Sequence, residues 1–297
     1  MRLDKWISEH HGLSRRAAQE AIRRGQVDVD GRRCLEPGTE VEGSSQVAFE
    51  PNRPRIGSAS RLLDVLYEDR QILIANKPAG VLTQPTTQRE RDTLLERAGR
   101  YLMRKRGFDQ PYVGIVHRLD KDTTGVILLV ISSGALRPFQ AMFRDHAIER
   151  NYLAVVDGVF VTGSGRIDLP LVPDRGDGRR GVARQPGQGL PAVTHFEVLE
   201  SFGRVASLVA CRLETGRTHQ IRIHLAEIGH PVVGDPVYRP RSLPKFPVPF
   251  RRQALHAVAL GFVHPISGEA LRVEAPLAAD LTELVEELRH RFGGTGR

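Results

Sequence analysis

Short apolar runs of four or five residues recur through residues 61–290, and they restrict the fold more than any other feature of the sequence. Runs of this length, bounded by polar residues, Gly or Pro, are typical of strands buried in a sheet. They lie at residues 71–74, 113–116, 126–130, 152–156, 205–209 and 270–273. Helical stretches are fewer, and the clearest are 136–146, 218–228 and 280–291. This pattern predicts an α+β domain built on a mixed, mainly antiparallel sheet.

Residues 51–60 divide the chain, because their Pro, Gly and Ser residues interrupt all periodicity and are typical of a linker. A length of 297 residues suits one large domain or two unequal ones. We therefore expect a small module over 1–50, a main domain over 61–292 and a flexible glycine-rich tail over 293–297. Two segments rich in Arg, Gly or Pro are expected to be basic surface loops, at 173–191 and 239–252.

The first module has signals for two helices and a hairpin. Leu3, Trp6 and Ile7 share one face of a first helix, and Ser14 is a good N-cap for a second. An alternating strand at residues 27–29 then ends in an Asp-Gly turn. We expect a small α/β module.

Composition excludes several classes of protein. No run approaches the ~20 apolar residues of a membrane-spanning helix, and the N-terminus has no apolar signal core. We therefore expect a soluble, cytoplasmic protein that does not bind membranes. Two cysteines, Cys34 and Cys211, are too few for a disulfide scaffold or a cysteine-based zinc site, so both are expected to be reduced thiols.

The net charge is +8, from 43 Lys and Arg against 35 Asp and Glu, and most of the basic residues are arginine. Guanidinium groups bind phosphate with two parallel hydrogen bonds, which favours a nucleic-acid partner. A genome rich in G and C would also enrich arginine, so the charge alone does not decide whether the partner is a nucleic acid. Residues 1–60 hold 10 basic and 9 acidic residues, which leaves +7 of the +8 in the main domain.

The densest polar cluster is residues 117–125, which separate two apolar runs. Asp120 lies there between Arg118 and Lys121, and nearby cations keep a carboxylate ionised, as a nucleophile or base requires. An ordinary turn would need Asp, Thr and Gly but not the basic residues. A phosphatase-type Asp-x-Asp-x-Thr motif is also present at 120–124, but it requires an apolar strand before the first Asp, and here the strand follows.

Residues 117–129 resemble the active-site loop of RluA-type RNA pseudouridine synthases. Further segments resemble that family's motifs in the same order, at 76–80, 150–155, 216–225, 229–231, 234–236, 252–257 and 264–265. The first module resembles the S4 RNA-binding domain at 2–6, 14–17, 22–25 and 27–31. The resemblance covers nearly the whole chain.

The resemblance implies the isomerisation of uridine to pseudouridine in RNA, without a cofactor. It implies that Asp120 is the catalytic carboxylate, that Arg222 pairs with it and that Tyr152 abuts the uracil. Asp120 either attacks C1′ or removes the C2′ proton; the sequence leaves both routes open. Residues implied in RNA contact or base flipping are Arg118, His117, Lys77, Arg217 and His219. In the S4-like module the residues implied in RNA contact are Arg2, Lys5, Arg15, Arg16, Arg23 and Arg24.

The segment 218–228 also has a physical interpretation as a helix. Thr218 is the predicted N-cap, Gly229 follows the predicted end, and Ile221, Leu225 and Ile228 form a buried stripe. Arg222, about 100° from Ile221 around the helix, is then expected at the edge of the site. His219 and His224 have no Cys or acidic ligand beside them, so we expect no metal.

The expected target is 23S ribosomal RNA, with transfer RNA second, because an S4-like module precedes an RluA-like core. We expect a monomer. A non-catalytic RNA-binding or ribosome-assembly protein is the alternative, but such a protein would not need Asp120, Tyr152 and Arg222 together.

Overall fold

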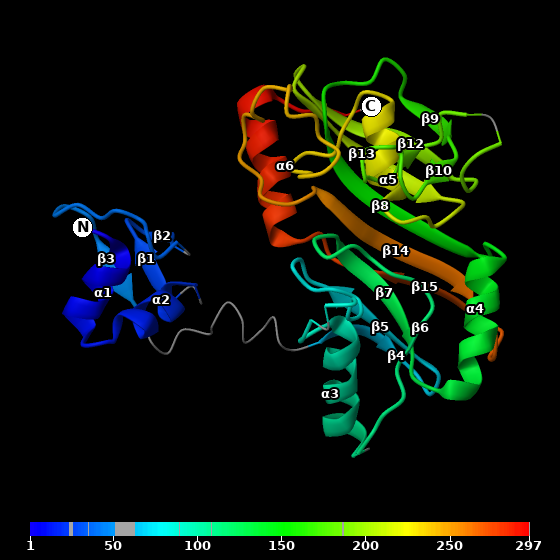
Figure 1. Ribbon diagram of the computed structural model, residues 1–297, viewed down its shortest axis with the longest axis horizontal. Coiled ribbons are helices and arrows are strands. Elements are labelled where there is room, and N and C mark those ends of the chain that lie inside the picture. Colours follow the sequence, from blue (N-terminus) through cyan, green and yellow to red (C-terminus); the bar gives the residue numbers. More distant parts are fainter. Residues whose placement is uncertain are drawn as a thin grey trace. The chain divides into compact units, whose positions relative to one another are not determined.

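The computed structural model describes residues 1–23, 26–34, 36–50, 63–88, 90–107, 109–185 and 187–296. The chain divides into two compact units, Met1–Leu62 and Leu63–Arg297 (Figure 1). The expected linker at 51–60 lies outside the described residues. Within these residues, no helix is long and apolar enough to cross a membrane.

In the first unit, two helices pack on a small antiparallel sheet. The helices are α1 (Leu3–His11) and α2 (Arg15–Arg23), and the strands, in the order β2-β1-β3, are Arg32–Arg33, Val27–Val29 and Val47–Phe49. The predicted cap is confirmed, because the Ala17 N–H donates to Ser14 Oγ at 3.2 Å. Asp30 and Gly31 both have positive φ, as the tight turn between β1 and β2 requires. The core of the unit contains Leu3, Ile7, Ala18, Ile22, Val27 and Val41.

The second unit is built on a mixed, mainly antiparallel sheet, as predicted. Its described strands form an eleven-stranded sheet with the order β16-β12-β13-β8-β14-β7-β5-β4, in which β9 pairs with β12, β6 with β7 and β15 with β14. Their bounds are β4 Asp64–Glu68, β5 Ile72–Lys77, β6 Gly114–Ile115, β7 Thr124–Val130, β8 Ile148–Asp157, β9 Ser164–Asp168, β12 Val193–Phe202, β13 Ala206–Leu213, β14 Leu255–Val263, β15 Ala270–Glu274 and β16 Thr295–Gly296. A separate ribbon pairs β10 (Leu171–Val172) with β11 (Gly181–Val182), so part of the predicted 173–191 loop is strand.

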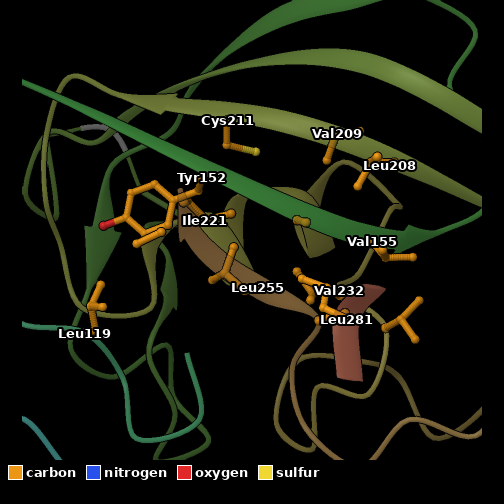
Figure 2. Packing of buried hydrophobic residues seen from close by; sticks show 14 of the residues in the cluster. Leu119, Tyr152, Val155, Leu208, Val209, Cys211, Ile221, Val232, Leu255 and Leu281 are labelled. Atoms are coloured by element: carbon orange, nitrogen blue, oxygen red, sulfur yellow. The ribbon is translucent and has the colours of Figure 1, made fainter. Parts of the chain in front are cut away.

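Helices cover both faces of this sheet. They are α3 (Leu94–Arg106), α4 (Leu136–Arg144, after a 3₁₀ turn at Ser133–Ala135), α5 (Gln220–Glu227) and α6 (Ala279–Phe292). Alternate residues of β5 and β7 enter two different hydrophobic clusters, as the two-residue period of a strand requires. Helices α3, α5 and α6 pack in the larger cluster, part of which Figure 2 shows, and α4 packs in the smaller one on the opposite face.

Strands β7 and β14 form the one parallel pair among the described strand pairs, and it is short. His256 faces Thr124 and Ala257 faces Gly125. Gly125 has a φ of 108°, and a Cβ there would lie 2.0 Å from the Ala257 carbonyl oxygen. A side chain at this position, where the polar loop 117–123 enters the sheet, would therefore force the two strands to shift apart.

The end of the chain differs from the prediction of a flexible tail. Thr295 and Gly296 pair as β16 with Ser201 and Glu200 of β12. A Cβ on Gly294 would lie 2.0 Å from Glu200 Oε1, so the absence of a side chain lets the backbone approach the strand. The glycine content that suggested disorder instead permits strand pairing.

Replacing Gly125 with Ala should destabilise the second unit by about 1–3 kcal/mol, because the methyl group meets the Ala257 carbonyl at a positive φ. Urea unfolding followed by far-UV circular dichroism measures this loss; Trp6, the one tryptophan, reports the first unit separately by fluorescence.

Gly99→Ala is the matched control, since Gly99 is within α3 and no atom beyond its own helix backbone lies within 4 Å of the place that a Cβ would take. It should stabilise the unit by roughly 0.5–1 kcal/mol. Equal midpoints for Gly125→Ala and the wild type would show that the close β7–β14 approach is not a constraint.

Candidate active site

Asp120 lies in the loop that joins β6 to β7, and buried contacts hold this loop from behind. Thr83 Oγ1 donates to the Leu119 carbonyl at 2.9 Å and accepts from the Leu119 N–H at 3.2 Å. The Thr123 N–H donates to the Asp120 carbonyl at 3.2 Å, which closes the turn. The Asp120 side chain is 17% exposed. Its carboxylate is therefore fixed in place but open to a ligand.

Arg222 of α5 joins Asp120 to a second carboxylate. Its Nη1 donates to Asp120 Oδ2 at 2.9 Å, and its Nε and Nη2 donate to the two oxygens of Asp235 at 2.6 and 3.0 Å. Burial alone would lower the pKa of Arg222, but the hydrogen bonds and charges of Asp235 and Asp120 raise it. This arrangement leaves Arg222 charged and aims one N–H at Asp120.

Asp235 is itself fixed by the backbone. It is fully buried and accepts from the N–H groups of Val237 and Tyr238 at 2.8 and 3.0 Å. The Arg222 guanidinium lies 5.1 Å from the centre of the Tyr238 ring, on its face. Sequence reasoning missed this role of Asp235, although its place between Gly234 and Pro236 in a motif was a signal.

The helix that carries Arg222 begins differently from the prediction. It starts at Gln220, after His219 in the left-handed conformation with a φ of 61°, so the prediction of a Thr218 cap is wrong. Gln220 Oε1 instead accepts from the Arg217 N–H and from Thr215 Oγ1, at 2.9 and 2.8 Å. The predicted apolar stripe is confirmed: Ile221 and Leu225 are in the main core and Ile228 packs against it.

Tyr152 of β8 is 8% exposed and belongs to the same core as Ile221 and Leu255. Figure 2 shows its ring at the end of the cluster, with the hydroxyl group directed away from those two side chains. Burial raises the pKa of Tyr152 to about 12, so its hydroxyl is protonated at neutral pH.

A cleft of about 710 Å³ opens beside Asp120. It brings together six of the predicted site residues, which are His117, Arg118, Asp120, Tyr152, Arg217 and His219. Arg144 and Arg150 also line it, and neither was predicted. Among the described residues that line the cleft, Asp120 is the one carboxylate, so the cleft is strongly cationic. Arg222 lines a small recess of about 50 Å³ with Asp120 and Tyr152.

Lys77 requires a correction. Its side chain is fully buried, so the prediction that it contacts RNA is wrong. Its ammonium group donates to the carbonyls of Pro78, Val81 and Lys121 at 3.0, 2.7 and 2.8 Å, and burial lowers its pKa to about 7. Lys77 therefore supports the Asp120 loop through the Lys121 carbonyl.

The two histidines of the cleft have different surroundings. His117 Nε2 accepts from the Leu128 N–H at 2.9 Å, its ring stacks on Phe143, and burial lowers its pKa to about 3. A neutral His117 is thus a wall of the cleft and not a cationic contact. His219 Nδ1 lies 2.8 Å from the Tyr238 hydroxyl, and its Nε2 lies 3.7 Å from Asp120 Oδ1.

Four of the predicted RNA-contacting residues of the first unit have described side chains, and all four are exposed. Arg2 and Arg15 lie near Asp4, at 3.1 and 3.6 Å, Lys5 lies 3.7 Å from Glu9, and Arg16 is also exposed. Arg24 and the side chain of Arg23 lie outside the described part of the structure. In the part that is described, no group of three or more His, Cys, Asp or Glu residues could hold a metal ion.

Comparison with known proteins agrees with this geometry. The family model for RNA pseudouridylate synthase matches residues 71–227, and the S4 domain model matches residues 1–47. The ribosomal large subunit pseudouridine synthase D of Escherichia coli K12 is 38% identical over 304 residues, covering 98% of this chain and 91% of that protein. An uncharacterized RNA pseudouridine synthase of Bacillus subtilis is 37% identical over 295 residues, covering 97% and 94%.

Solved structures show the same fold. The human RNA pseudouridylate synthase domain containing 1 matches with a TM-score of 0.59 and 26% identity, over 77% of this chain and 96% of that one. The human domain containing 4 matches with a TM-score of 0.63 and 24% identity, over 76% and 93%. With the family model matching residues 71–227, the chain belongs to the RNA pseudouridylate synthase family and carries an S4 domain at its N-terminus.

Proposed function

We propose that this enzyme converts specific uridines of 23S ribosomal RNA to pseudouridine, acting as a monomer in the cytoplasm. The observation that carries the proposal is Asp120, held by Arg222 Nη1 at 2.9 Å on the wall of a cationic cleft. The large-subunit target is supported by the name of the Escherichia coli relative, which this chain matches over 98% of its length.

The reaction is an isomerisation and needs no oxidant, reductant or energy source. The C1′–N1 bond breaks and its electron pair leaves with the uracil. The base then turns so that C5 forms a bond to C1′, the proton on C5 departs, and N1 gains a proton. The enzyme must therefore handle a cationic centre at the sugar and a negative charge on the base.

Asp120 is the group suited to the sugar. An ionised carboxylate either attacks C1′ or removes the C2′ proton, and both routes need the negative charge that Arg222 helps to hold. Because Arg222 is also bound by Asp235, it neutralises Asp120 only in part. The remaining negative charge faces the cleft, where the sugar would lie.

Tyr152 is suited to the base. With a pKa of about 12 the phenol is neutral at pH 7, so it offers the uracil a flat ring and an O–H donor. If it accepts the C5 proton, its own proton must first move to another group. The ring therefore serves first to position the base beside Asp120.

Arg118 is suited to base flipping. Extracting a base from structured RNA costs a few kcal/mol, and a side chain that occupies the vacated stack offsets part of this. Arg118 is exposed beside Asp120 in the cleft. Arg144 and Arg217 line the same cleft and would bind the neighbouring phosphates.

Asp120→Asn should abolish pseudouridine formation while RNA binding stays near the wild-type level, because the amide keeps the shape but loses the charge. Single-turnover assays on a 23S transcript measure the rate, and filter binding measures affinity. The exposed Asp168 is the matched control, and Asp168→Asn should react at the wild-type rate. Substantial turnover by Asp120→Asn would contradict the assignment of Asp120 as the catalytic carboxylate.

Arg222→Lys should lower the single-turnover rate by roughly 10²-fold and leave RNA affinity unchanged, because an ammonium cannot bridge both carboxylates as the guanidinium does. The control is Arg212→Lys, the same change at an exposed position of β13. A wild-type rate for Arg222→Lys would mean that the bridging of Asp120 and Asp235 by the guanidinium has no part in the reaction.

A further inference from the structure

Arg150 of β8 is a buried charge without an acidic partner. Its side chain is 5% exposed, and it lies two residues from Tyr152, so both point to the same face of the strand. Its Nη2 donates to the Glu214 carbonyl at 2.8 Å, but its buried Nε has no hydrogen-bond partner. Within the described part of the chain, no carboxylate forms an ion pair with it.

The other buried arginines of the described structure all have a carboxylate. Arg97 binds Asp92, Arg222 binds Asp235 and Asp120, and Arg252 binds Asp280. Burying an unpaired charge costs several kcal/mol, and burial lowers the pKa of Arg150 accordingly. Such a cost is tolerated where a ligand supplies the missing partner, so Arg150 indicates a binding site for negative charge.

The surrounding structure leaves room for this guanidinium at the cleft. A Cβ on Gly216 would lie 2.3 Å from Arg150 Nη1, so the group occupies space that any side chain at 216 would fill. Arg150 lines the cleft together with Asp120 and Tyr152. The Arg150 side chain therefore lines the same cleft as the two residues that would hold the uridine.

The depth of Arg150 distinguishes between two sources of negative charge. Arg118 and Arg144 are exposed and Arg217 is half-buried, so these residues can reach the phosphates of the RNA backbone. Arg150 is only 5% exposed as a residue, so its guanidinium is better reached by the flat edge of a base than by a phosphate, which stays linked to two nucleosides. The uracil becomes such an anion when it takes the electron pair of the C1′–N1 bond, with charge on N1, O2 and O4.

We propose that Arg150 is a further catalytic residue, which stabilises the negative charge that develops on the uracil as the C1′–N1 bond breaks. The inference rests on the proposed function. The guanidinium donates to the base edge and keeps its own protons throughout, while the C5 proton leaves after the new bond forms. Because intact uridine is neutral, the interaction strengthens in the transition state and raises the rate more than the affinity.

The test compares uridine with 5-fluorouridine in otherwise identical 23S transcripts, using the full-length protein under single-turnover conditions. Fluorine withdraws electrons and lowers the pKa of the departing base, so the negative charge on the base needs less stabilisation by the protein. Each pKa unit corresponds to a factor of ten in the acid dissociation constant. Loss of the target nucleoside is followed by nuclease digestion and mass spectrometry, and RNA affinity by filter binding.

Arg150→Gln should lower the rate on uridine by about 10²-fold, and the defect should shrink to about tenfold on 5-fluorouridine, with RNA affinity unchanged. Gly216→Ala tests the same point with Arg150 in place, because the methyl group must displace the guanidinium. It should show the same dependence on the base. Arg212→Gln, at an exposed site of β13, should react like the wild type with both RNAs.

Equal defects of Arg150→Gln on the two bases, or a loss confined to RNA affinity, would overturn the proposal and indicate a phosphate contact or a structural role. Should Arg150→Gln fail to fold by circular dichroism, Gly216→Ala decides by the same comparison. A wild-type protein that forms no pseudouridine would contradict the proposed function instead, so the two failures are distinguishable.

Discussion

The ion pair between Asp120 and Arg222 joins parts of the chain that are 102 residues apart, and the site depends on it. Asp235 holds two of the donor nitrogens of Arg222, and the backbone at 237 and 238 holds Asp235, which leaves Nη1 directed at Asp120. Arg222 carries one positive charge and binds two carboxylates, so the cluster of Asp120, Arg222 and Asp235 is net negative. Asp120 faces the cleft, and both attack on C1′ and removal of the C2′ proton would need its negative charge.

The order of the strands around the site brings the Asp120 loop near Tyr152. Asp120 precedes β7, Tyr152 is on β8, and β14 lies between these two strands. The short parallel contact at Gly125 and Ala257 brings β7 against β14, and thus places the Asp120 loop near Tyr152. Cationic residues then surround the single acidic group of the described cleft wall. Arg118 and Arg144 are exposed there, and Arg150 is buried.

Much of this could be predicted from the sequence where the signal is local. Strands such as β5 and β7 are continuous apolar runs because both of their faces are buried, and Asp120 stood out because charged residues interrupt two such runs. The resemblance to a family then paired Arg222 with Asp120.

Strand β14 was not predicted, because its His256 and Gly261 break the apolar pattern. The prediction that Lys77 contacts RNA was wrong because the sequence shows the charge of its side chain but not the three backbone carbonyls that accept its hydrogen bonds. The isolation of Arg150 is likewise a tertiary property: an arginine near acids in sequence can be far from them in space.

Asp120, held by Arg222, is the residue proposed to drive uridine isomerisation in 23S ribosomal RNA. The most direct measurement is a map of pseudouridines in total RNA from a strain that lacks this gene, complemented with the wild type or with Asp120→Asn. We expect one or more positions in 23S RNA to lose pseudouridine in the deletion strain, and only the wild-type gene to restore them. A 23S map unchanged by the deletion, or restored equally by Asp120→Asn, would contradict the proposal.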